Sequence, residues 1–568
     1  MQETTPNFVP FNSELDWRFA EWAVKDGPGQ KAIDHLLTIP GVQEKLGLSY
    51  NNIRALLQKV DSVPDRTGQW QTRELSFRDK PDEKYTIHFR DPIEAIKTLF
   101  MDPAFENDHV YGLKNVYTDS SKSSRIFSEM CTRKWWHAIQ GATIAPIILA
   151  TDKTQLTQFS GGKSAKNACI LIAYLSVEKL NRSKMTEFEH RSRVQCLFHE
   201  AIRIVLEPLK KAGKEGIRMR CSNGDICHVY PILACYVADY PEQCLVTCTK
   251  YGTCPKCQCP AENLQNFKQS PLRTKPWTER IIAEAKKKGD KLPKDKSPKE
   301  FHKECMAHDV TGGIYTPFWQ DFPYTDIHKC ITLDILGAKC KNMVKILLGC
   351  LVSIMAPSGI KAIKGLLDFI YLAQYMVHNN ETLGYMKDAL KEFHKHKEYF
   401  IEIGCREHLN LPKFYSLLHY VKSIQYFSTT DNYNTEMFEW LHIDFAKHGW
   451  RATNQCDEFP QMIHWLSQQE KITYFNTLLA LQKAETSSEA SGPTIAKFPN
   501  YPNHSISLIK NSHSAPHFSF HLKNYLSTFQ NSRFTTQCLD ITFLPFTHLD
   551  VYKMFCFQPV SLQDNEEE

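Results

Sequence analysis

The sequence has 568 residues, of which 42% are hydrophobic, 23% charged and 12% aromatic. These proportions exclude a disordered chain or a single small module and indicate a folded protein of several structural units. The net charge of +5 neither indicates nor excludes nucleic acid as a partner. All 19 cysteines lie after residue 130, a distribution that does not match a secreted scaffold held together by disulfides.

The first 130 residues show amphipathic helical patterns between polar loops. Residues 17–38 fit a helix that is interrupted at Gly27-Pro28-Gly29, and 43–60 and 92–100 fit two more helices. The chain starts without the basic and apolar regions of a secretory signal, and its apolar stretches, such as 343–356, are too short to span a bilayer. We therefore expect no membrane segment and a reducing compartment.

A strand-rich block follows. Residues 144–150 and 168–177 are apolar runs of the length and composition of buried strands. Alternating residues on both sides of Asn223-Gly224 predict a β-hairpin over 217–233, and a third apolar run covers 232–238. Between these strands, an amphipathic helix is predicted that breaks at Pro208.

Two aspartates stand at the carboxyl ends of predicted strands. Asp152 follows the run 144–150, and Asp239 follows the run 232–238. Two such carboxylates, joined by a third from a helix, could hold two Mg²⁺ ions for phosphodiester chemistry. Strand-end aspartates are also common caps and turn formers, so the pattern alone leaves both interpretations open.

Five cysteines lie within 16 residues, from Cys244 to Cys259. Cys254 and Cys257 have the C-x₂-C spacing that lets two thiolates bind one tetrahedral zinc. The expected zinc ligands are Cys248, Cys254, Cys257 and Cys259, with Cys244 as the alternative and His228 and His302 as outside candidates. Small buried thiols and redox chemistry are the competing interpretations.

The next segment, 261–304, is hydrophilic and carries 12 basic and 7 acidic residues, a surplus equal to the net charge of the whole chain. It fits a solvated loop and helix face, or a segment that contacts nucleic acid or directs nuclear import. Helical patterns then cover 361–377, 383–402 and 458–484, before a Ser- and Pro-rich stretch that resembles a linker and, over 534–558, a segment expected to add strands.

The predicted helix at 434–449 carries several acidic residues. Glu439 and His442 are three residues apart and share a face, which fits either a solvated surface or a metal site. The remaining histidines at helical spacings, among them His419, are expected to be surface or hydrogen-bonded core residues. Because the chain contains no phosphate-binding loop or dinucleotide fingerprint, a nucleotide-driven enzyme is not expected.

Six collinear segments point to a family. They are PIILATDKTQLTQFSGGKSA (146–165), LFHEAIRIVLEPLKKAGKEGI (197–217), VYPILACYVADYPEQCLVTCTKYGTCPKC (229–257), ITLDILGAKCKN (331–342), GLLDFIYLAQY (365–375) and LPKFYSLLHYVKSIQYFSTTDNYNTEMFEWLHIDFAKHGWRATNQ (411–455). Together they resemble Plavaka-type transposases of fungal cut-and-paste elements, a branch of the CACTA-like group.

The resemblance implies an α/β protein with an RNase H-like core, a mixed sheet with flanking helices, interrupted by a large and mostly helical insertion. It also implies a DDE triad that binds two Mg²⁺ or Mn²⁺ ions. Matched position by position, Asp152 and Asp239 are the first two acidic residues of this triad. Glu439 matches the third, with Glu436 as the alternative, and the C-x₂-C of the family falls on Cys254 to Cys257.

The chain departs from the family pattern at several positions. The D-x-x-H element of the family falls on Asp334, with Gly337 in place of the histidine. Trp440 stands where relatives usually have arginine, and a segment that relatives carry after Gly161-Gly162-Lys163-Ser164-Ala165 is absent. These departures indicate a partly degenerate or transposon-derived copy.

The resulting hypothesis is a transposase-derived protein whose ancestral activity is metal-dependent DNA strand cleavage and strand transfer at transposon ends. The alternative is a catalytically inactive relative that acts as a DNA-binding or protein-interaction module. The implied partner is double-stranded DNA, and the expected location is the nucleus. A homo-oligomer is left open.

The expected divisions are a helical region (1–130), the first part of the core (131–243), a zinc knuckle (244–260), a basic spacer and helical insertion (261–425), a core helix with the third acidic residue and following helices (426–484), a linker (485–533) and a C-terminal strand segment with an acidic tail (534–568).

Overall fold

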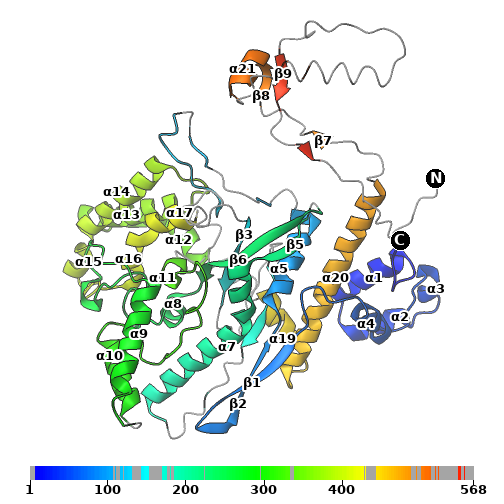
Figure 1. Cartoon of the computed structure of the whole chain (residues 1–568), viewed down its shortest axis with the longest axis horizontal. Helices are drawn as coiled ribbons and strands as arrows, with labels where there is room; N and C mark the ends of the chain where they lie inside the picture. The colour runs from blue at the N-terminus through cyan, green and yellow to red at the C-terminus, as the bar shows by residue number, and fades with distance from the viewer. Residues whose placement is uncertain are drawn as a thin grey trace, which may run out of the picture. The chain divides into compact units, whose positions relative to one another are not determined.

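The structure is a computed structural model of the chain. It describes residues 7–105, 109–110, 115–118, 121–130, 143–151, 169–175, 180, 185–222, 224–293, 296–332, 338–427, 429, 443–487, 494–495, 501–512, 519, 522, 548–551 and 555–556. Two compact units can be distinguished, Phe8–Leu478 and a smaller one of Met1–Asn7 with Leu479–Glu568. Figure 1 labels most of the helices and strands named below.

Short helices open the larger unit: α1 (Glu14–Lys25), α2 (Gln30–Leu37), α3 (Val42–Leu46) and α4 (Ile53–Asp61). The Ser13 side chain caps α1 by accepting a hydrogen bond from the backbone of Asp16, which satisfies one of the free N–H groups at a helix start. Trp17 is fully buried against Phe11 and Phe475, the last of which lies on the long helix α20 (Glu458–Ser487). The predicted helices are thus confirmed, except that Gly47 divides the second segment into two.

A sheet not predicted from the sequence follows these helices. Strand β1 (Gln71–Phe77) pairs antiparallel with β2 (Lys80–Phe89), which also pairs with the short β4 (Ala173–Leu175). Most side chains of β1 are exposed and polar, so the strand lacks the alternation of apolar residues by which strands are recognised. Helix α5 (Pro92–Met101) then begins at the capping side chain of Asp91, as predicted from its apolar pattern.

A second sheet is mixed. Strand β3 (Thr143–Ala150) runs parallel to β6 (Ile226–Val237), and β5 (Ile217–Arg220) pairs antiparallel with the start of β6. These strands and the predicted hairpin are confirmed, and with them an α/β fold that contains a mixed sheet. The run predicted at 168–177 contributes only β4, which pairs with β2 and not with β3.

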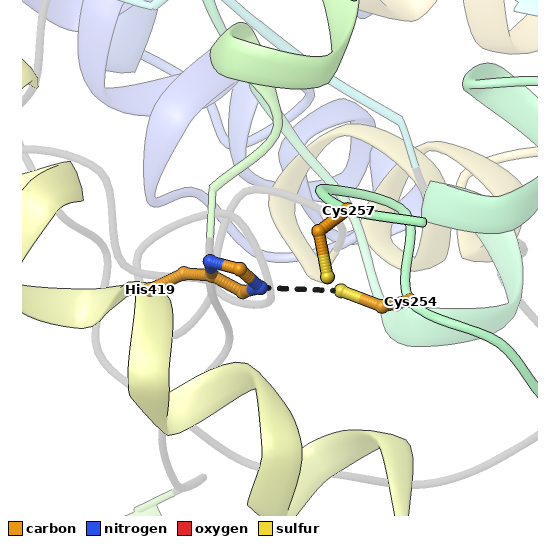
Figure 2. A group of neighbouring side chains, drawn as sticks. All are labelled: Cys254, Cys257 and His419. Atoms are coloured by element: carbon orange, nitrogen blue, oxygen red, sulfur yellow. Dashed lines mark hydrogen bonds between the residues drawn. The ribbon is translucent and has the colours of Figure 1, made fainter. Parts of the chain in front are cut away.

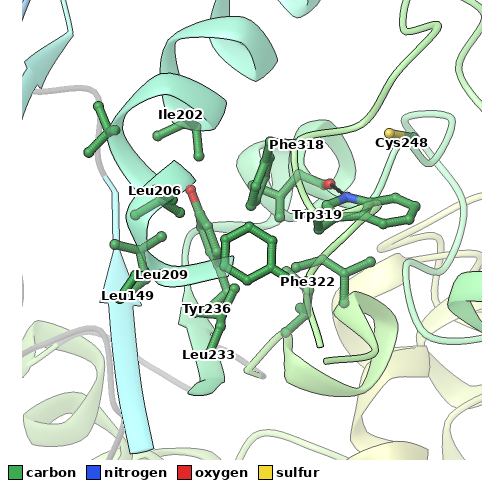
Figure 3. Close-up of a cluster of buried hydrophobic side chains, with 14 of the residues drawn as sticks. Leu149, Ile202, Leu206, Leu209, Leu233, Tyr236, Cys248, Phe318, Trp319 and Phe322 are labelled. Atoms are coloured by element: carbon green, nitrogen blue, oxygen red, sulfur yellow. Dashed lines mark hydrogen bonds between the residues drawn. The ribbon is translucent and has the colours of Figure 1, made fainter. Parts of the chain in front are cut away.

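Helix α7 (Glu187–Glu215) packs on the mixed sheet. The predicted break at Pro208 is wrong, because the helix continues through it to Glu215. Proline removes only one backbone hydrogen bond, and the helix buries Val205, Leu206 and Leu209 on both sides of that position. Figure 3 shows Leu206 and Leu209 of α7 in one cluster with Leu149 of β3, Tyr236 of β6 and the aromatic residues Phe318 and Trp319.

The hydrophilic segment after the cysteines is a folded part of this core. It forms η3 (Ala261–Asn263) and a pair of packed helices, α9 (Lys275–Gly289) and α10 (Ser297–Met306). Ile281, Ile282 and Phe301 are buried in the same hydrophobic cluster as the sheet residues, while most lysines of the two helices are exposed. The segment therefore combines a solvated helix face with an apolar face that joins the core.

The remainder of the larger unit is helical. It contains α12 (Ala338–Leu351), α13 (Pro357–Ala373), α14 (Asn380–His396), α15 (Tyr399–Glu402), α16 (Pro412–Ser416), η4 (Leu417–His419), α17 (Tyr420–Phe427), η6 (Ile443–His448) and α19 (Gly449–Arg451). Helices α13 and α14 approach closely at Gly365, where a Cβ atom would lie 2.8 Å from the carbonyl oxygen of Ala389. The two helices predicted for this region are confirmed with small shifts of their bounds.

The smaller unit contains short elements. Strand β7 (Thr494–Ile495) pairs with β10 (Phe555–Cys556), and β8 (Tyr501–Ser505) pairs with β9 (His548–Val551) before helix α21 (Ile506–Ser512). Strands are thus found in the segment where the C-terminal β-rich pattern predicts them. Within the described parts of both units, we find no helix with the length and hydropathy needed to cross a membrane.

A buried ion pair connects the first sheet to α20. The guanidinium of Arg90 is 1% exposed and donates to both carboxylate oxygens of Glu470, to the Thr67 hydroxyl and to the Leu171 carbonyl. We expect Arg90→Met to lower the free energy of unfolding by about 3 kcal/mol, because it leaves a partly buried carboxylate without its cation. Urea denaturation would measure the change, and Lys84→Met, which removes an exposed ion pair with Glu74, should have little effect.

Candidate functional site

The two strands that carry the predicted aspartates lie side by side. In the parallel ladder, Ala150 of β3 pairs with Val237 of β6, and the amide of Thr151 continues the ladder to the Val237 carbonyl at 3.4 Å. Asp152 and Asp239 each come two residues after a member of this last pair. Asp152 itself lies outside the described residues.

Asp239 is exposed and stands at the start of helix α8 (Tyr240–Val246). Its Oδ1 accepts a hydrogen bond from the amide of Glu242 at 2.9 Å, which makes it the N-cap of that helix. The aspartate therefore has a structural role as a cap and remains accessible to solvent.

A third segment joins this edge of the sheet. Ile331, which follows α11 (Ile327–Cys330), forms an isolated parallel bridge with Tyr236, and the amide of Thr332 donates to the Tyr236 carbonyl at 3.1 Å. Asp334 and Gly337 come shortly after this bridge in the sequence but lie outside the described residues. The same holds for Glu436 and Glu439, so the structure gives no position for the predicted third acidic residue.

The most distinct cluster of metal-ligating side chains consists of Cys254, Cys257 and His419 (Figure 2). Their sulfur and nitrogen atoms all lie within 4.8 Å of one another, and Cys254 Sγ is 3.4 Å from His419 Nε2. All three side chains are buried. Thiolate and imidazole are the ligands that zinc prefers in proteins, so this group could hold a zinc ion.

The backbone of the C-x₂-C turn is held by two buried side chains. The Nε of Arg273 donates to the carbonyls of Cys254 and Cys257, at 3.0 Å each, and its amide donates to the Lys256 carbonyl. His328 contacts the Pro255 carbonyl through Nδ1 at 2.8 Å, while its Nε2 contacts the Thr278 hydroxyl. Each carbonyl of the turn thus has a partner, which fixes the direction of both thiols.

Two buried cations accompany the thiols. Burial lowers the pKa of Lys256 to about 8 and also lowers the pKa of Arg273, while the nearby cysteine sulfurs oppose both shifts. The pKa of Cys257 is lowered by hydrogen bonding from the Cys254 thiol, and His419 and the Tyr415 hydroxyl add to the effect. Burial raises the pKa of Cys254, so this environment favours a thiolate at Cys257 and a protonated thiol at Cys254 in the absence of a metal.

The other predicted zinc ligands have different surroundings. Cys248 is buried in the main hydrophobic cluster, with its sulfur 3.9 Å from His199 Nε2, and burial raises the pKa of Cys244 to about 12. Cys259 packs in the same small cluster as Cys254 and Cys257, next to the Tyr415 ring. Tyr415 contacts Cys257 through its hydroxyl at 3.2 Å, and the same hydroxyl interacts with Cys259.

His419 was not predicted as a ligand. It follows Cys257 by more than 160 residues and belongs to the turn η4, in a helical region with several other histidines at similar spacings. A local pattern could not single it out, because its proximity to the cysteines depends on the packing of α16 and α17 against the turn. His228 and His302, the outside candidates, are not members of this cluster.

A comparison with curated proteins found no match. A family model matches in two segments, residues 50–166 and 162–348, which together cover more than half of the sequence. The matched region includes β3, β6, Asp239 and the C-x₂-C turn, and the model describes the Plavaka transposase. The chain therefore belongs to the Plavaka transposase family.

Proposed function

We propose that this protein is a transposase-derived nuclease of the DDE type, whose ancestral reaction is cleavage and transfer of DNA strands at transposon ends. One observation carries the proposal. The parallel pairing of β3 with β6 ends at Ala150 and Val237, and in the sequence both predicted aspartates follow this pair at the same distance. Residues that follow neighbouring parallel strands at equal distance meet at one edge of a sheet.

The arrangement of the mixed sheet supports an RNase H-like core. Ile331 bridges β6 in parallel, opposite Tyr236, and Asp334 follows Ile331 by the same three residues by which Asp239 follows Tyr236. We use "acidic edge" for the edge of the mixed sheet at which Asp152 and Asp239 follow β3 and β6 in the sequence. We infer that Asp334 belongs to this acidic edge. The described strands of the larger unit form two separate three-stranded sheets, and only the sheet of β3, β5 and β6 carries the predicted aspartates at its strand ends.

The third acidic residue is expected from the segment after α17. Phe427, the last residue of that helix, is buried against Cys235 and Val237 of β6. The chain thus leaves α17 beside the carboxyl end of β6, nine residues before Glu436 and twelve before Glu439. This position favours Glu439, or Glu436, as the third ligand of the proposed site.

In this proposal Asp152, Asp239 and Glu439 bind two Mg²⁺ or Mn²⁺ ions, which would activate an attacking water or hydroxyl and stabilise the leaving oxygen. The protein contributes the geometry. Asp239 is exposed, as a ligand for DNA-bound metal must be, and the α8 backbone fixes its Oδ1 through the amide of Glu242. The strand ladder holds the chain at Thr151, one residue before Asp152.

We further propose that Cys254, Cys257 and His419 bind a structural zinc ion, with Cys259 as the fourth ligand. Cys259 is the remaining thiol in the small cluster around Tyr415. A third thiolate would give the site a net negative charge, which the buried Lys256 and Arg273 would balance. Such an ion would join the turn after α8 to the helices α16 and α17.

A second candidate function is DNA binding without cleavage. The segment 275–306 presents exposed lysines on α9 (Lys287), on α10 (Lys299) and in the connection between them (Lys291 and Lys296). Exposed lysines can contact the phosphate backbone and confer affinity without sequence specificity. The missing histidine at Gly337 favours this reading over full activity.

Asp239→Asn tests the proposed nuclease. We expect it to lower the rate of strand cleavage on DNA that carries the terminal repeats of the surrounding locus at least about 100-fold, because removing a metal ligand costs several kcal/mol in the transition state. Asp225→Asn, in the β5–β6 turn, is the matched control and should cleave normally. If the unmodified protein binds this DNA but leaves it intact in Mg²⁺ and in Mn²⁺, the second function replaces the first.

The zinc site predicts a specific metal content. The purified protein should contain about one zinc per chain, and His419→Ala should lower the zinc content and the thermal stability, because a four-ligand structural site loses one donor. Elemental analysis and thermal melting would measure the two effects. His408→Ala, an exposed histidine eleven residues earlier, should change neither. Full zinc content in His419→Ala would contradict the assignment.

A further inference from the structure

A buried chain of hydrogen bonds connects β6, the end of β3 and helix α8. The Thr151 hydroxyl lies 2.9 Å from the Tyr236 hydroxyl and 2.5 Å from Oε1 of Glu242. Tyr236 is completely buried, and Glu242 is only 7% exposed. Burying a carboxylate costs free energy, so it is useful to ask which groups the hydrogen bonds of Glu242 hold in place.

The direction of these bonds follows from the chemistry of the groups. An ionised carboxylate can only accept, so Thr151 donates its hydroxyl proton to Glu242. The Thr151 oxygen is then free to accept, and Tyr236 donates to it. Burial raises the pKa of Tyr236, and the negative charge of Glu242 raises it further, so the phenol remains a donor. The Thr151 side chain is thereby fixed from two sides.

The side chain of Glu242 makes a different contact from the one that its position in the helix suggests. It is the third residue of α8, where a glutamate commonly reaches back to the amide of the N-cap and completes a capping box. Helix α7 shows that arrangement, with Glu189 accepting from the amide of Thr186. In α8, the amide of Glu242 binds Asp239 as in a capping box, but its carboxylate accepts from Thr151 on the other strand.

One residue thus contacts both strand ends of the acidic edge. The backbone of Glu242 holds the side chain of Asp239, and its carboxylate holds Thr151, the last described residue before Asp152. We propose that Glu242 is a positioning residue, which sets the separation between the carboxyl ends of β3 and β6 at the metal site. The proposal rests on the proposed function, because it assigns Glu242 a role toward that same pair of aspartates.

The physical reason lies in the tolerance of metal sites. Two ions about 4 Å apart need ligands held within about 0.5 Å of their working positions. The end of a sheet ladder is its least restrained part, because a terminal residue has ladder neighbours on one side only. A buried hydrogen bond across that end replaces the missing restraint. Removing such an outer partner typically weakens metal binding by about 10- to 100-fold.

The test measures binding of Mn²⁺ alone to the full-length, zinc-loaded protein, followed by the electron paramagnetic resonance of the free ion. Glu242→Ala should weaken Mn²⁺ binding about tenfold. Glu242→Gln, whose amide oxygen can still accept from Thr151, should bind within about twofold of the unmodified protein. Thr151→Val removes the same bond from the other side, so it should match Glu242→Ala, and the double variant should be no weaker than either single one.

Controls separate this role from a general loss of structure. Glu207→Ala, an exposed glutamate of α7, should leave Mn²⁺ binding unchanged. Circular dichroism and zinc content of the Glu242 and Thr151 variants should equal those of the unmodified protein, since the cysteine cluster does not include them. An equal loss in Glu242→Gln and Glu242→Ala would overturn the proposal, because Glu242 would then bind the metal directly.

The two proposals fail in different ways. If the unmodified protein binds no Mn²⁺, or if Asp239→Asn binds it as well as the unmodified protein does, the acidic edge is not a metal site and the proposed function fails. If Asp239→Asn abolishes Mn²⁺ binding while Glu242→Ala leaves it unchanged, the metal site stands and only the positioning role of Glu242 is refuted.

Discussion

The parallel pairing of β3 with β6 is the constraint on which the rest of the larger unit depends. Parallel neighbours cannot be joined by a tight turn, so the chain must return over a long connection, here residues 151–225. Most of the described part of that connection is α7, which covers the sheet. Gly213 permits the close approach, because a Cβ atom there would lie 2.9 Å from the Pro231 carbonyl of β6. The pairing therefore determines both the position of α7 and which residues follow the strands at one edge.

The turn that follows α8 adds a second constraint, which is electrostatic. Lys256 and Arg273 are both buried beside Cys254 and Cys257, and two cations in an apolar interior need anions close by. A thiolate at Cys257 meets part of that need, and a bound metal would also keep Cys254 deprotonated. Arg273 therefore stabilises the turn in two ways, through its positive charge and through its hydrogen bonds to two carbonyls.

The sequence predicted those features that have a short-range pattern. Apolar runs located β3 and the end of β6, and Asn223-Gly224 located the hairpin, because burial and turn chemistry act over a few residues. Strand β1 was not predicted because its side chains are mostly polar and exposed. The pairing of β4 with β2 rather than β3 depends on tertiary contacts, which a local sequence pattern does not reveal. The packing of α9 and α10 into the core was not predicted, because their many lysines make the segment hydrophilic overall and few of its apolar residues are buried.

The candidate sites show the same limit. The C-x₂-C spacing indicated Cys254 and Cys257, whereas His419 depends on helices that approach the turn only in the folded chain. Glu242 looked like an ordinary helix-cap residue until its partner on β3 was known. Predictions from spacing therefore identified residues that act with near neighbours in sequence, and missed each one whose partner comes from a distant element.

Helix α17 relates the two sites to each other within the larger unit. It begins directly after His419, at the cysteine cluster, and ends at Phe427, which packs on Val237 at the carboxyl end of β6. Its eight residues span about 12 Å, so a single helix connects the cysteine cluster with the carboxyl end of β6. A shift of His419 relative to Cys254 would move Phe427 as well, and with it the start of the segment that carries Glu436 and Glu439. If both proposed sites bind metal, α17 is an element that joins them through packing.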